Sequence, residues 1–362
     1  IPDEVRQVAI LKHSLNLMDK VLSSYLRPYP ELVNPYTGKI HPVYKETGTV
    51  TGRISCEKPN FQQIPRQGLL ICKECNVVIK GVCPLCGGTN SKEIANVNDA
   101  LAVPPGFVLV NADYSQMEVR VLAHVTGDPE LKRALQEGLD LHSYTASKIF
   151  NLDYNYVVEN KDNPKVKTLR QQAKAVTFGI IYGITPQGLA ATLKCAPYEA
   201  EYMIKEFFNT YRVVKQWIDR VHKTVEEHHW IATPIGRVRH FDVVTPKQLR
   251  EAQNYVIQSF ASDIAVHAAK LVSDYLKETG YGSLIGFVHD SIKTQVKKEV
   301  IEQVIDMKKH IMEHRMREIY QISVPLVAEV NVVETYAVDP NTDRKVQEED
   351  ITPVLLDSLL LF

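Results

Sequence analysis

Two aspartates, Asp113 and Asp290, each follow a short apolar segment that predicts a strand, at residues 107–110 and 283–288. A carboxylate at a strand end is held rigidly, so it can bind a hard cation with little rearrangement. If both strands share one sheet, the two carboxylates can hold two Mg²⁺ ions, as in-line phosphoryl or nucleotidyl transfer requires. Each acid also has a simpler interpretation, because Asp often caps a helix and often occupies a turn.

A second group of residues is spaced for one helix face. Two cations are followed by two aromatic residues at intervals of four: Arg170, Lys174, Phe178 and Tyr182. Side chains at this spacing lie on the same side of a helix. Such a face suits a triphosphate beside a stacked base. The alternative is a solvated basic turn next to two core aromatic residues.

Four of the six cysteines lie in one short segment. They form two Cys-x2-Cys pairs, Cys72 with Cys75 and Cys83 with Cys86. This spacing predicts a tetrahedral Zn²⁺ site, and a site closed by four thiolates is structural. Free thiols or a redox pair are the alternative interpretation. The histidines at 222, 228, 229 and 240 are better explained by a solvated face and a loop than by a metal site.

The composition is that of an ordinary water-soluble chain. Of its 362 residues, 44% are hydrophobic and 23% are charged, which excludes a mainly disordered chain. The 42 Lys and Arg residues balance the 43 Asp and Glu residues, so a basic coat is excluded but a basic groove is not. No apolar run reaches eighteen residues, so we expect no membrane partner. Cysteines clustered in this way favour a reducing compartment, and hence the cytoplasm, or the host cytoplasm for a viral protein.

The elements that must position these residues can be read from hydrophobic periodicity. Residues 1–26 predict a helix with an apolar stripe, which Pro28 and Pro30 would end. Residues 34–66 predict turns and short strands. Helices are expected over residues 115–230 and 299–320, a hairpin over residues 283–296, and a strand over residues 324–333.

Read in order, these segments resemble the family A DNA polymerases, the bacterial DNA polymerase I group. Residues 113–120 (Asp-Tyr-Ser-Gln-x-Glu-x-Arg) resemble motif A of that family. Residues 170–183 (Arg-x3-Lys-x3-Phe-x3-Tyr-Gly) resemble motif B, and His289-Asp290 resembles motif C. Thr51-Gly52-Arg53 and residues 59–65 precede all three, and the resemblance covers about residues 1–338.

The resemblance implies a role for individual residues. Asp113, Asp290 and the carbonyl of Tyr114 would hold two Mg²⁺ ions. Arg170, Lys174 and His142 would contact the triphosphate, and Lys174 would also protonate the leaving pyrophosphate. Phe178 and Tyr182 would shape the pocket for base and sugar, with Gln116 and Glu118 beneath the nucleotide. Since Phe178 follows Lys174 by one turn, its ring is expected to pack against Glu118. The primer and template would be contacted by Arg53, Arg250, Asn254, Gln258 and His289.

The fold implied by the resemblance is an α+β right-hand polymerase, with an antiparallel palm, helical fingers and a small zinc-ribbon-like insert. The expected divisions are a thumb remnant helix (1–26), palm (27–66), four-cysteine zinc insert (67–98), palm with motif A (99–130), fingers with motif B (131–244), palm with motif C (245–338) and an acidic C-terminal tail (339–362). The N-terminus lacks Met, so we expect a trimmed or partial chain. The rest of the thumb and any exonuclease would then belong to a missing segment or a separate chain.

The expected activity is template-directed addition of dNTPs to a primer 3′-hydroxyl on DNA, without proofreading in this chain. Two other functions remain open: a single-subunit RNA polymerase, and a catalytically inactive DNA-binding relative. Glu118 disfavours the first, because that position crowds a ribose 2′-hydroxyl in the DNA enzymes. The intact Asp113, Asp290, Arg170 and Lys174 disfavour the second. One departure from the family is Ser291, where motif C usually has Glu, and it is expected to alter metal preference.

Overall fold

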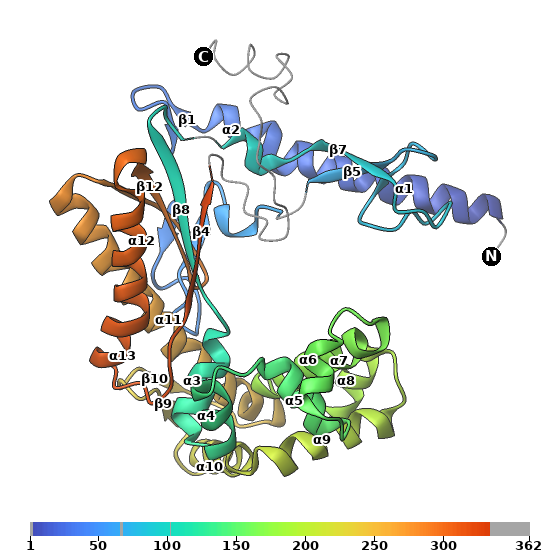
Figure 1. The fold of residues 1–362 in the computed structure, drawn as a ribbon, viewed down its shortest axis with the longest axis vertical. Coiled ribbons are helices and arrows are strands. Elements are labelled where there is room, and N and C mark those ends of the chain that lie inside the picture. Colours follow the sequence, from blue (N-terminus) through green and yellow to red (C-terminus); the bar gives the residue numbers. More distant parts are fainter. Residues whose placement is uncertain (1–2, 66–67, 102, 334–362) are drawn as a thin grey trace.

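The computed structural model describes residues 3–65, 68–101 and 103–333 (Figure 1). At its centre is a four-stranded antiparallel sheet with the order β11-β12-β8-β13. Two long elements on one side of the sheet, α11 and α12, pack against its strands (Figure 1). The bounds are β8 Phe107–Tyr114, β11 Gly282–Val288, β12 Ser291–Lys297, β13 Ala328–Val333, α11 Pro246–Thr279 and α12 Ile301–Lys309. This combination of helices and an antiparallel sheet confirms the predicted α+β fold class.

The register of the sheet sets which side chains share a face. Ser291 of β12 and Glu329 of β13 both lie opposite Asp113 of β8. The Tyr114 hydroxyl donates to the Met312 carbonyl at 2.9 Å, so Tyr114 points toward the helices behind the sheet. Because successive side chains of a strand alternate, Asp113 points to the opposite face.

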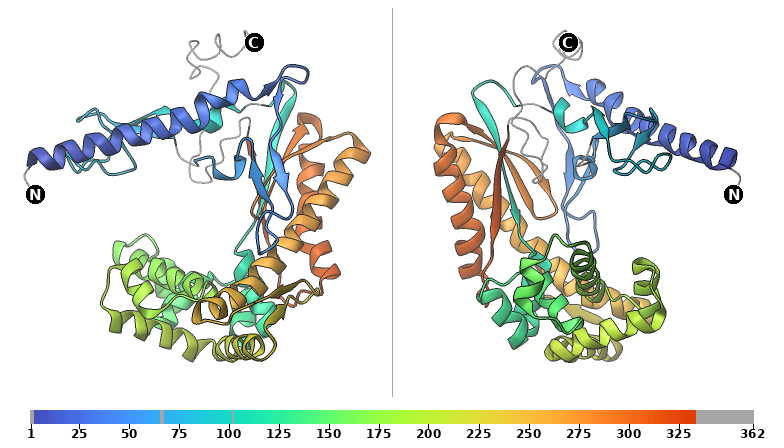
Figure 2. Two further views of the ribbon diagram at one scale, coloured as in Figure 1. Left: turned by 180° about the vertical axis from the view of Figure 1, so that it is seen from behind. Right: turned by 45° about the vertical axis from the view of Figure 1, so that its right-hand side comes forward.

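A helical layer follows β8 and projects from one end of the sheet (Figures 1 and 2). Several of its helices start at side-chain caps; for example, Asp128 and Asp140 each accept a backbone N–H of the first turn. Buried side chains of this layer and of the sheet form one continuous core. The layer comprises α3 Met117–Thr126, α4 Pro129–Gln136, α5 Leu141–Ile149, α6 Tyr154–Glu159, α7 Pro164–Ile181, α8 Pro186–Leu193, α9 Pro197–Thr210 and α10 Arg212–His228, with the small hairpin β9 Trp230–Ala232 and β10 Val238–His240.

The N-terminal helical stretch is followed directly by a short second helix that starts at Pro28. Helix α1 spans Asp3–Val21, a π-helical turn η1 spans Leu22–Leu26, and α2 spans Pro28–Glu31. Pro28 is tolerated because it occupies the first turn of α2, where a missing N–H costs no internal hydrogen bond. The predicted helical stretch therefore ends at Leu26, as expected, and Pro28 begins a separate short helix.

The apolar stripe of α1 is largely exposed rather than buried. Val5, Val8, Leu11 and Leu15 are 50–65% exposed, whereas Ser14, on another face, is buried. The reason is that the cysteine-rich segment packs against the face that carries Ser14, and no described element covers the stripe.

The cysteine-rich segment forms a small three-stranded sheet beside α1, with the order β6-β5-β7 (Figure 2). Its strands are β5 Leu69–Cys72, β6 Val78–Ile79 and β7 Ser91–Ala95, followed by the 3₁₀ turn η3 Val97–Ala100. Before it lie the predicted turns and short strands: β1 Val33–Asn34, β2 Lys39–Ile40, β3 Val43–Lys45, β4 Ser55–Glu57 and the 3₁₀ turn η2 Phe61–Gln63.

The C-terminal predictions hold with shifted bounds. The helical region predicted from 299 to 320 divides into the 3₁₀ turn η4 Lys298–Val300, α12, the π-helical turn η5 His310–Arg315 and α13 Met316–Ile319. The final strand starts at Ala328 rather than residue 324, since Pro325 cannot donate to a ladder and its carbonyl accepts from Arg120. The predicted acidic tail, 339–362, lies outside the described residues. Among the described helices, none has the length and apolar character of a membrane span.

Candidate functional site

The two predicted strand-end acids come together at one end of the central sheet. Asp290 lies in the two-residue turn between β11 and β12, and its neighbour Ser291 lies opposite Asp113. His289 completes this turn in the left-handed region, with φ of 59°. The helix-cap interpretation of Asp113 does not apply, because α3 begins after Gln116, which has φ of 54° and no capping side-chain bond.

The electrostatics of this pair suit a bound cation. Burial raises the pKa of Asp290 to about 7, and the charge of Asp113 acts in the same direction. Two carboxylates that oppose each other's ionisation are stabilised as anions by a divalent cation between them. Oxygen ligands of this kind are those that Mg²⁺ prefers. The residues present therefore fit the predicted magnesium site.

Glu118 lies beside the acids, at the junction of the sheet and the helical layer. This carboxylate is buried, and it accepts from Arg53 Nη2 at 2.5 Å and from the Tyr182 hydroxyl at 2.8 Å. Burial raises the pKa of Tyr182 to about 12, and the Glu118 charge adds to this shift. Arg53, Met117, Glu118, His289 and Asp290 line one small pocket. Thus the structure brings together residues from the sheet hairpin, α3 and the N-terminal segment.

The aromatic ring next to Glu118 is Tyr182, which caps the C-terminus of α7. Phe178, one turn earlier, instead lies near the Lys174 ammonium and the His142 ring, at 5.9 and 6.0 Å from its ring centroid. The helix face predicted to carry Arg170, Lys174, Phe178 and Tyr182 is therefore present, but its two aromatic residues have different neighbours.

Arg170 is held by the N-terminus of α5. Its Nε donates to Ser143 Oγ at 2.7 Å and its Nη2 donates to Asp140 Oδ2 at 2.5 Å. The sequence interpretation did not assign Asp140 and Ser143 to the site. A capping signal could have found Asp140, because Asp before a helical segment predicts an N-cap.

His142, on the same helix, has an unusual environment. Its Nδ1 is buried without a hydrogen-bond partner. Burial lowers the pKa of His142 to about 4, with the charge of Lys174 acting in the same direction. The neutral imidazole of His142 lies beside two cations and would gain a hydrogen-bond partner when an anion binds. This cluster is therefore suited to phosphate oxygens.

The three polar residues predicted on one face of α11 lie near the end of α7. The Gln258 side chain lies close enough to Tyr182 to lower the pKa of its phenol, against the larger effect of burial, and the Arg250 side chain lies so close to Gly183 that an added Cβ would be 2.5 Å from Arg250 Cβ. Gly183 also has φ of 70°, so glycine suits both the backbone and the contact. Asn254 Nδ2 is buried without a partner.

Ser291, at the position where motif C usually has Glu, forms a neutral pair. Its hydroxyl donates to Asn111 Oδ1 at 2.6 Å, and both side chains are buried on the Asp113 face of the sheet. The acids that motifs A and C bring to the site are thus Asp113, Asp290 and Glu118, and Glu329 of β13 lies opposite Asp113 as well.

The four clustered cysteines form a separate site beside α1. Their sulfurs all lie within 4.8 Å of one another, and Cys72 Sγ is 3.7 Å from Cys86 Sγ. Backbone amides around Cys86 lower the pKa of Cys83, whereas the Cys86 thiol raises the pKa of Cys75. Across the described ranges, this is the only cluster of three or more potential His, Cys, Asp or Glu metal ligands. Of the four histidines predicted to form a solvated face and a loop, His222 hydrogen-bonds to Gln253.

Comparison with known proteins covers most of the chain. The model of the family "DNA polymerase family A" matches residues 6–338. A thermostable DNA polymerase I from Thermus filiformis is 33% identical over 322 residues, which cover 87% of this chain and 34% of the relative. DNA polymerase I from Deinococcus radiodurans is 32% identical over 320 residues, which cover 86% and 30%.

A solved structure gives the same result. The POL domain of Pol1 from M. smegmatis, in complex with DNA primer-template and dNTP, superposes with a TM-score of 0.69 at 26% identity, covering 90% of this chain and 51% of that one. The chain spans about a third of the length of the curated relatives. With its motifs in order and its family match over residues 6–338, the chain belongs to DNA polymerase family A.

Proposed function

We propose that this chain is a template-directed DNA polymerase that adds dNTPs to a primer 3′-hydroxyl and releases pyrophosphate. The observation that carries the proposal is the juxtaposition of Asp113 and Asp290, which the β8–β12 register brings to one sheet end. The relative from M. smegmatis was solved with primer-template and dNTP, which supports these partners for this chain.

The proposal assigns Asp113, Asp290 and the Tyr114 carbonyl to two Mg²⁺ ions. When bound, the ions activate the attacking hydroxyl and neutralise charge on the pyrophosphate. The protein's own contribution is to position the two carboxylates. The two-residue turn and the pleat of the strands hold both of them on the same face of the sheet before the substrate binds.

Arg170, Lys174 and His142 form the proposed triphosphate site. Arg170 is preorientated by Asp140 and Ser143, so its guanidinium needs little ordering when it meets a phosphate. We assign Lys174 to protonation of the leaving pyrophosphate. Phe178 and Tyr182 are assigned to base and sugar, and Gln116 and Glu118 to the floor of the pocket.

The proposed duplex contacts are Arg53, Arg250, Asn254, Gln258 and His289. They come from the N-terminal segment, α11 and the β11–β12 turn, and their elements meet around Glu118 and Tyr182. The domain division given above, including the thumb remnant and the absence of proofreading from this chain, belongs to the same proposal, as does a cytoplasmic location. A further segment or chain would supply the remaining thumb and an exonuclease.

We also assign a structural Zn²⁺ to Cys72, Cys75, Cys83 and Cys86, whose sulfurs already lie together. Metal analysis of the purified chain is expected to give about one zinc per molecule. A Cys83→Ser/Cys86→Ser double variant is expected to contain none.

Primer extension tests the proposed activity. The purified chain is given a primer–template and either dNTPs or rNTPs. Extension with dNTPs and little with rNTPs supports a DNA polymerase. Preferential use of rNTPs indicates an RNA polymerase instead, and binding of the duplex without any extension indicates an inactive relative.

A further inference from the structure

The four cysteines are already placed as ligands of one ion. Four thiolates at about 2.3 Å from a tetrahedral zinc lie about 3.8 Å from one another. The Cys72–Cys86 sulfur separation is 3.7 Å, and all four sulfurs lie within 4.8 Å. Zinc can therefore enter with only small side-chain adjustment.

The insert, residues 68–98, has too small a core to fold without such an ion. Its buried core consists of Cys72, Val77, Ile79 and Cys83. Two of these four residues are themselves proposed ligands. Segments below about 40 residues usually need a metal, disulfides or a partner to fold, and ligand binding then supplies the folding free energy.

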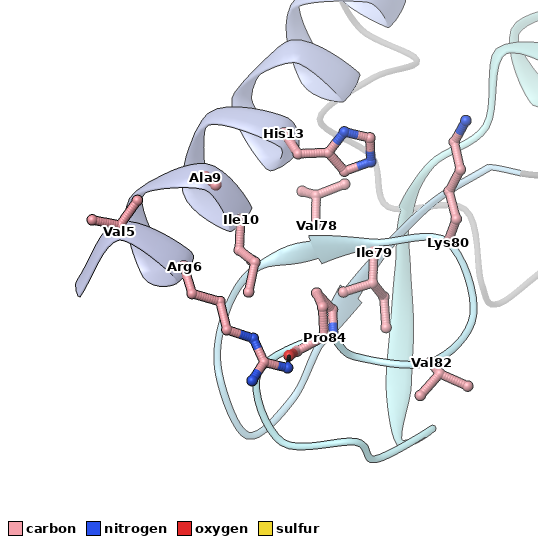
Figure 3. Close-up of a pocket in the computed structure, with 10 residues that line it drawn as sticks. All are labelled: Val5, Arg6, Ala9, Ile10, His13, Val78, Ile79, Lys80, Val82 and Pro84. Carbon is pink, nitrogen blue, oxygen red and sulfur yellow. Dashed lines mark hydrogen bonds between the residues drawn. The ribbon is translucent and has the colours of Figure 1, made fainter. Parts of the chain in front are cut away.

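This insert is the main tertiary partner of α1. The backbone N–H of Val78 donates to Ser14 Oγ at 2.7 Å, and both residues are buried. Arg6 donates weakly to the Pro84 carbonyl, at 3.5 Å. An apolar groove of about 590 Å³ lies between the two. Figure 3 shows Ile10 on the helix and Ile79 on β6 among its lining.

The other end of the helical stretch has a different support. Val21, Tyr25 and Tyr29 pack with Cys56, Phe61 and Val97 in a separate hydrophobic cluster. Within the part of the chain that the structure describes, the first four turns of α1 have their largest tertiary contact with β6 of the insert. The direction of those turns thus depends on the insert.

We propose that zinc binding by the four cysteines converts the insert into a brace that fixes the N-terminal half of α1. Figure 1 shows that α1 and the helical layer α5–α9 project from opposite ends of the sheet toward the same side. If α1 belongs to the DNA-binding thumb, as the proposed function assigns it, the brace also sets how the duplex is held. That consequence rests on the proposed function, whereas the brace itself does not.

Amide hydrogen exchange of the whole chain, without DNA or nucleotide, tests the brace. Zinc-loaded protein is compared with protein from which a chelator has removed zinc. The amides of residues 3–15 are expected to lose about tenfold or more of their protection against exchange when zinc is removed. Without the folded insert, local opening of α1 breaks no contact with it and so costs less free energy. Residues 22–31 and α11 are expected to keep their protection, and added zinc is expected to restore α1.

Two variants separate the brace from a general effect of the metal. Ser14→Ala removes the bond to Val78 while favouring the helix, so it is expected to keep its zinc and to lose part of the protection of residues 3–15. Cys195→Ser, which changes a cysteine outside the cluster, is the control and is expected to match the wild type. Unchanged protection of residues 3–15 without zinc, equal loss of protection throughout the molecule, or failure to bind zinc would each overturn the proposal.

The consequence for DNA is measured separately. Affinity for a primer–template is expected to fall several-fold without zinc, while the rate of single-nucleotide incorporation at saturating DNA stays unchanged. If α1 loses its protection against exchange but the affinity for primer–template is unchanged, the thumb assignment of α1 is refuted. The brace itself is tested by hydrogen exchange only.

Discussion

Tyr182 and Glu118 join the last residue of the α7 region to the first turn of α3. The Tyr182 hydroxyl donates to Glu118 Oε2 at 2.8 Å and approaches Oε1 at 3.1 Å. Arg53 donates to the same carboxylate. The buried charge of Glu118 is thus held by one cation and one phenol, and the orientation of the Tyr182 ring depends on Glu118.

Removing this carboxylate is expected to weaken selection against ribonucleotides. Glu118→Ala frees the Tyr182 ring and opens space under the sugar, so the ratio of dNTP to rNTP incorporation efficiency should fall by about tenfold or more, consistent with about 1–3 kcal/mol for such a contact. Glu118→Gln is the matched control, since it keeps size and an acceptor, and it should retain most of the selection. Steady-state or single-turnover efficiencies for both substrates provide the measurement. An unchanged ratio in Glu118→Ala would show that this side chain does not limit the sugar.

Neutralising either strand-end acid is expected to stop incorporation. Asp113→Asn and Asp290→Asn keep the side-chain size but remove one charge of the proposed metal site, which should cost several kcal/mol of transition-state stabilisation, about a thousandfold in rate or more. Primer–template affinity should change little, because phosphate contacts elsewhere supply most of it. Single-turnover extension and a binding titration test both points. Near wild-type rates in either variant would exclude the two-metal assignment.

His142 is expected to titrate at unusually low pH. Its pKa of about 4 in the folded chain lies below the ordinary value of 6.5. The unfolded chain therefore binds a proton that the folded chain does not between these values, so the stability contributed by neutral His142 is present above about pH 6.5 and is lost as pH falls toward 4. A bound triphosphate should raise the pKa again. Imidazole resonances, assigned with His142→Gln, are followed by NMR with and without dNTP, and the same midpoint in both titrations would argue against triphosphate contact.

A buried lysine behind the sheet is expected to stabilise the two neighbouring strands β8 and β12. Lys308 Nζ donates to the carbonyls of Val110 and Ile292, at 2.7 and 2.8 Å, and to Thr294 Oγ at 3.2 Å. Lys308→Met removes these donors from buried acceptors and should lower the free energy of unfolding by about 1–3 kcal/mol. Lys309→Met, at the exposed neighbouring position, is the matched control and should have little effect. Urea unfolding of both variants decides it, and equal midpoints would show that the Lys308 bonds contribute nothing net.

The features predictable from sequence are those set by local pattern. Asp113 and Asp290 could be located because each follows an apolar segment, and the hairpin between residues 283 and 296 follows from alternation around a short turn. The cysteine pairs needed only their spacing. In each case the deciding information lies within one short segment of the sequence.

The features that sequence reasoning missed depend on tertiary packing. The sequence predicts an apolar stripe on one side of α1, but that side is exposed. The insert covers the side that carries Ser14 instead. That Tyr182, not Phe178, meets Glu118 depends on how the end of α7 is placed relative to the first turn of α3. The burial of Lys308 was not anticipated, since a lysine is rarely buried and its three acceptors come from two distant strands.

The two-residue turn that carries His289 and Asp290 restricts how this gene can vary in length. A single inserted or deleted codon in β11 or β12 would shift the pairing by one residue and move every side chain of that strand to the other face. Asp290 would then face away from Asp113. The loops of the insert end on open surface near Gly81 and Gly87, where an added Cβ meets nothing within 4 Å. Length changes should accumulate there and be nearly absent from the hairpin in any library of insertion and deletion variants selected for polymerisation.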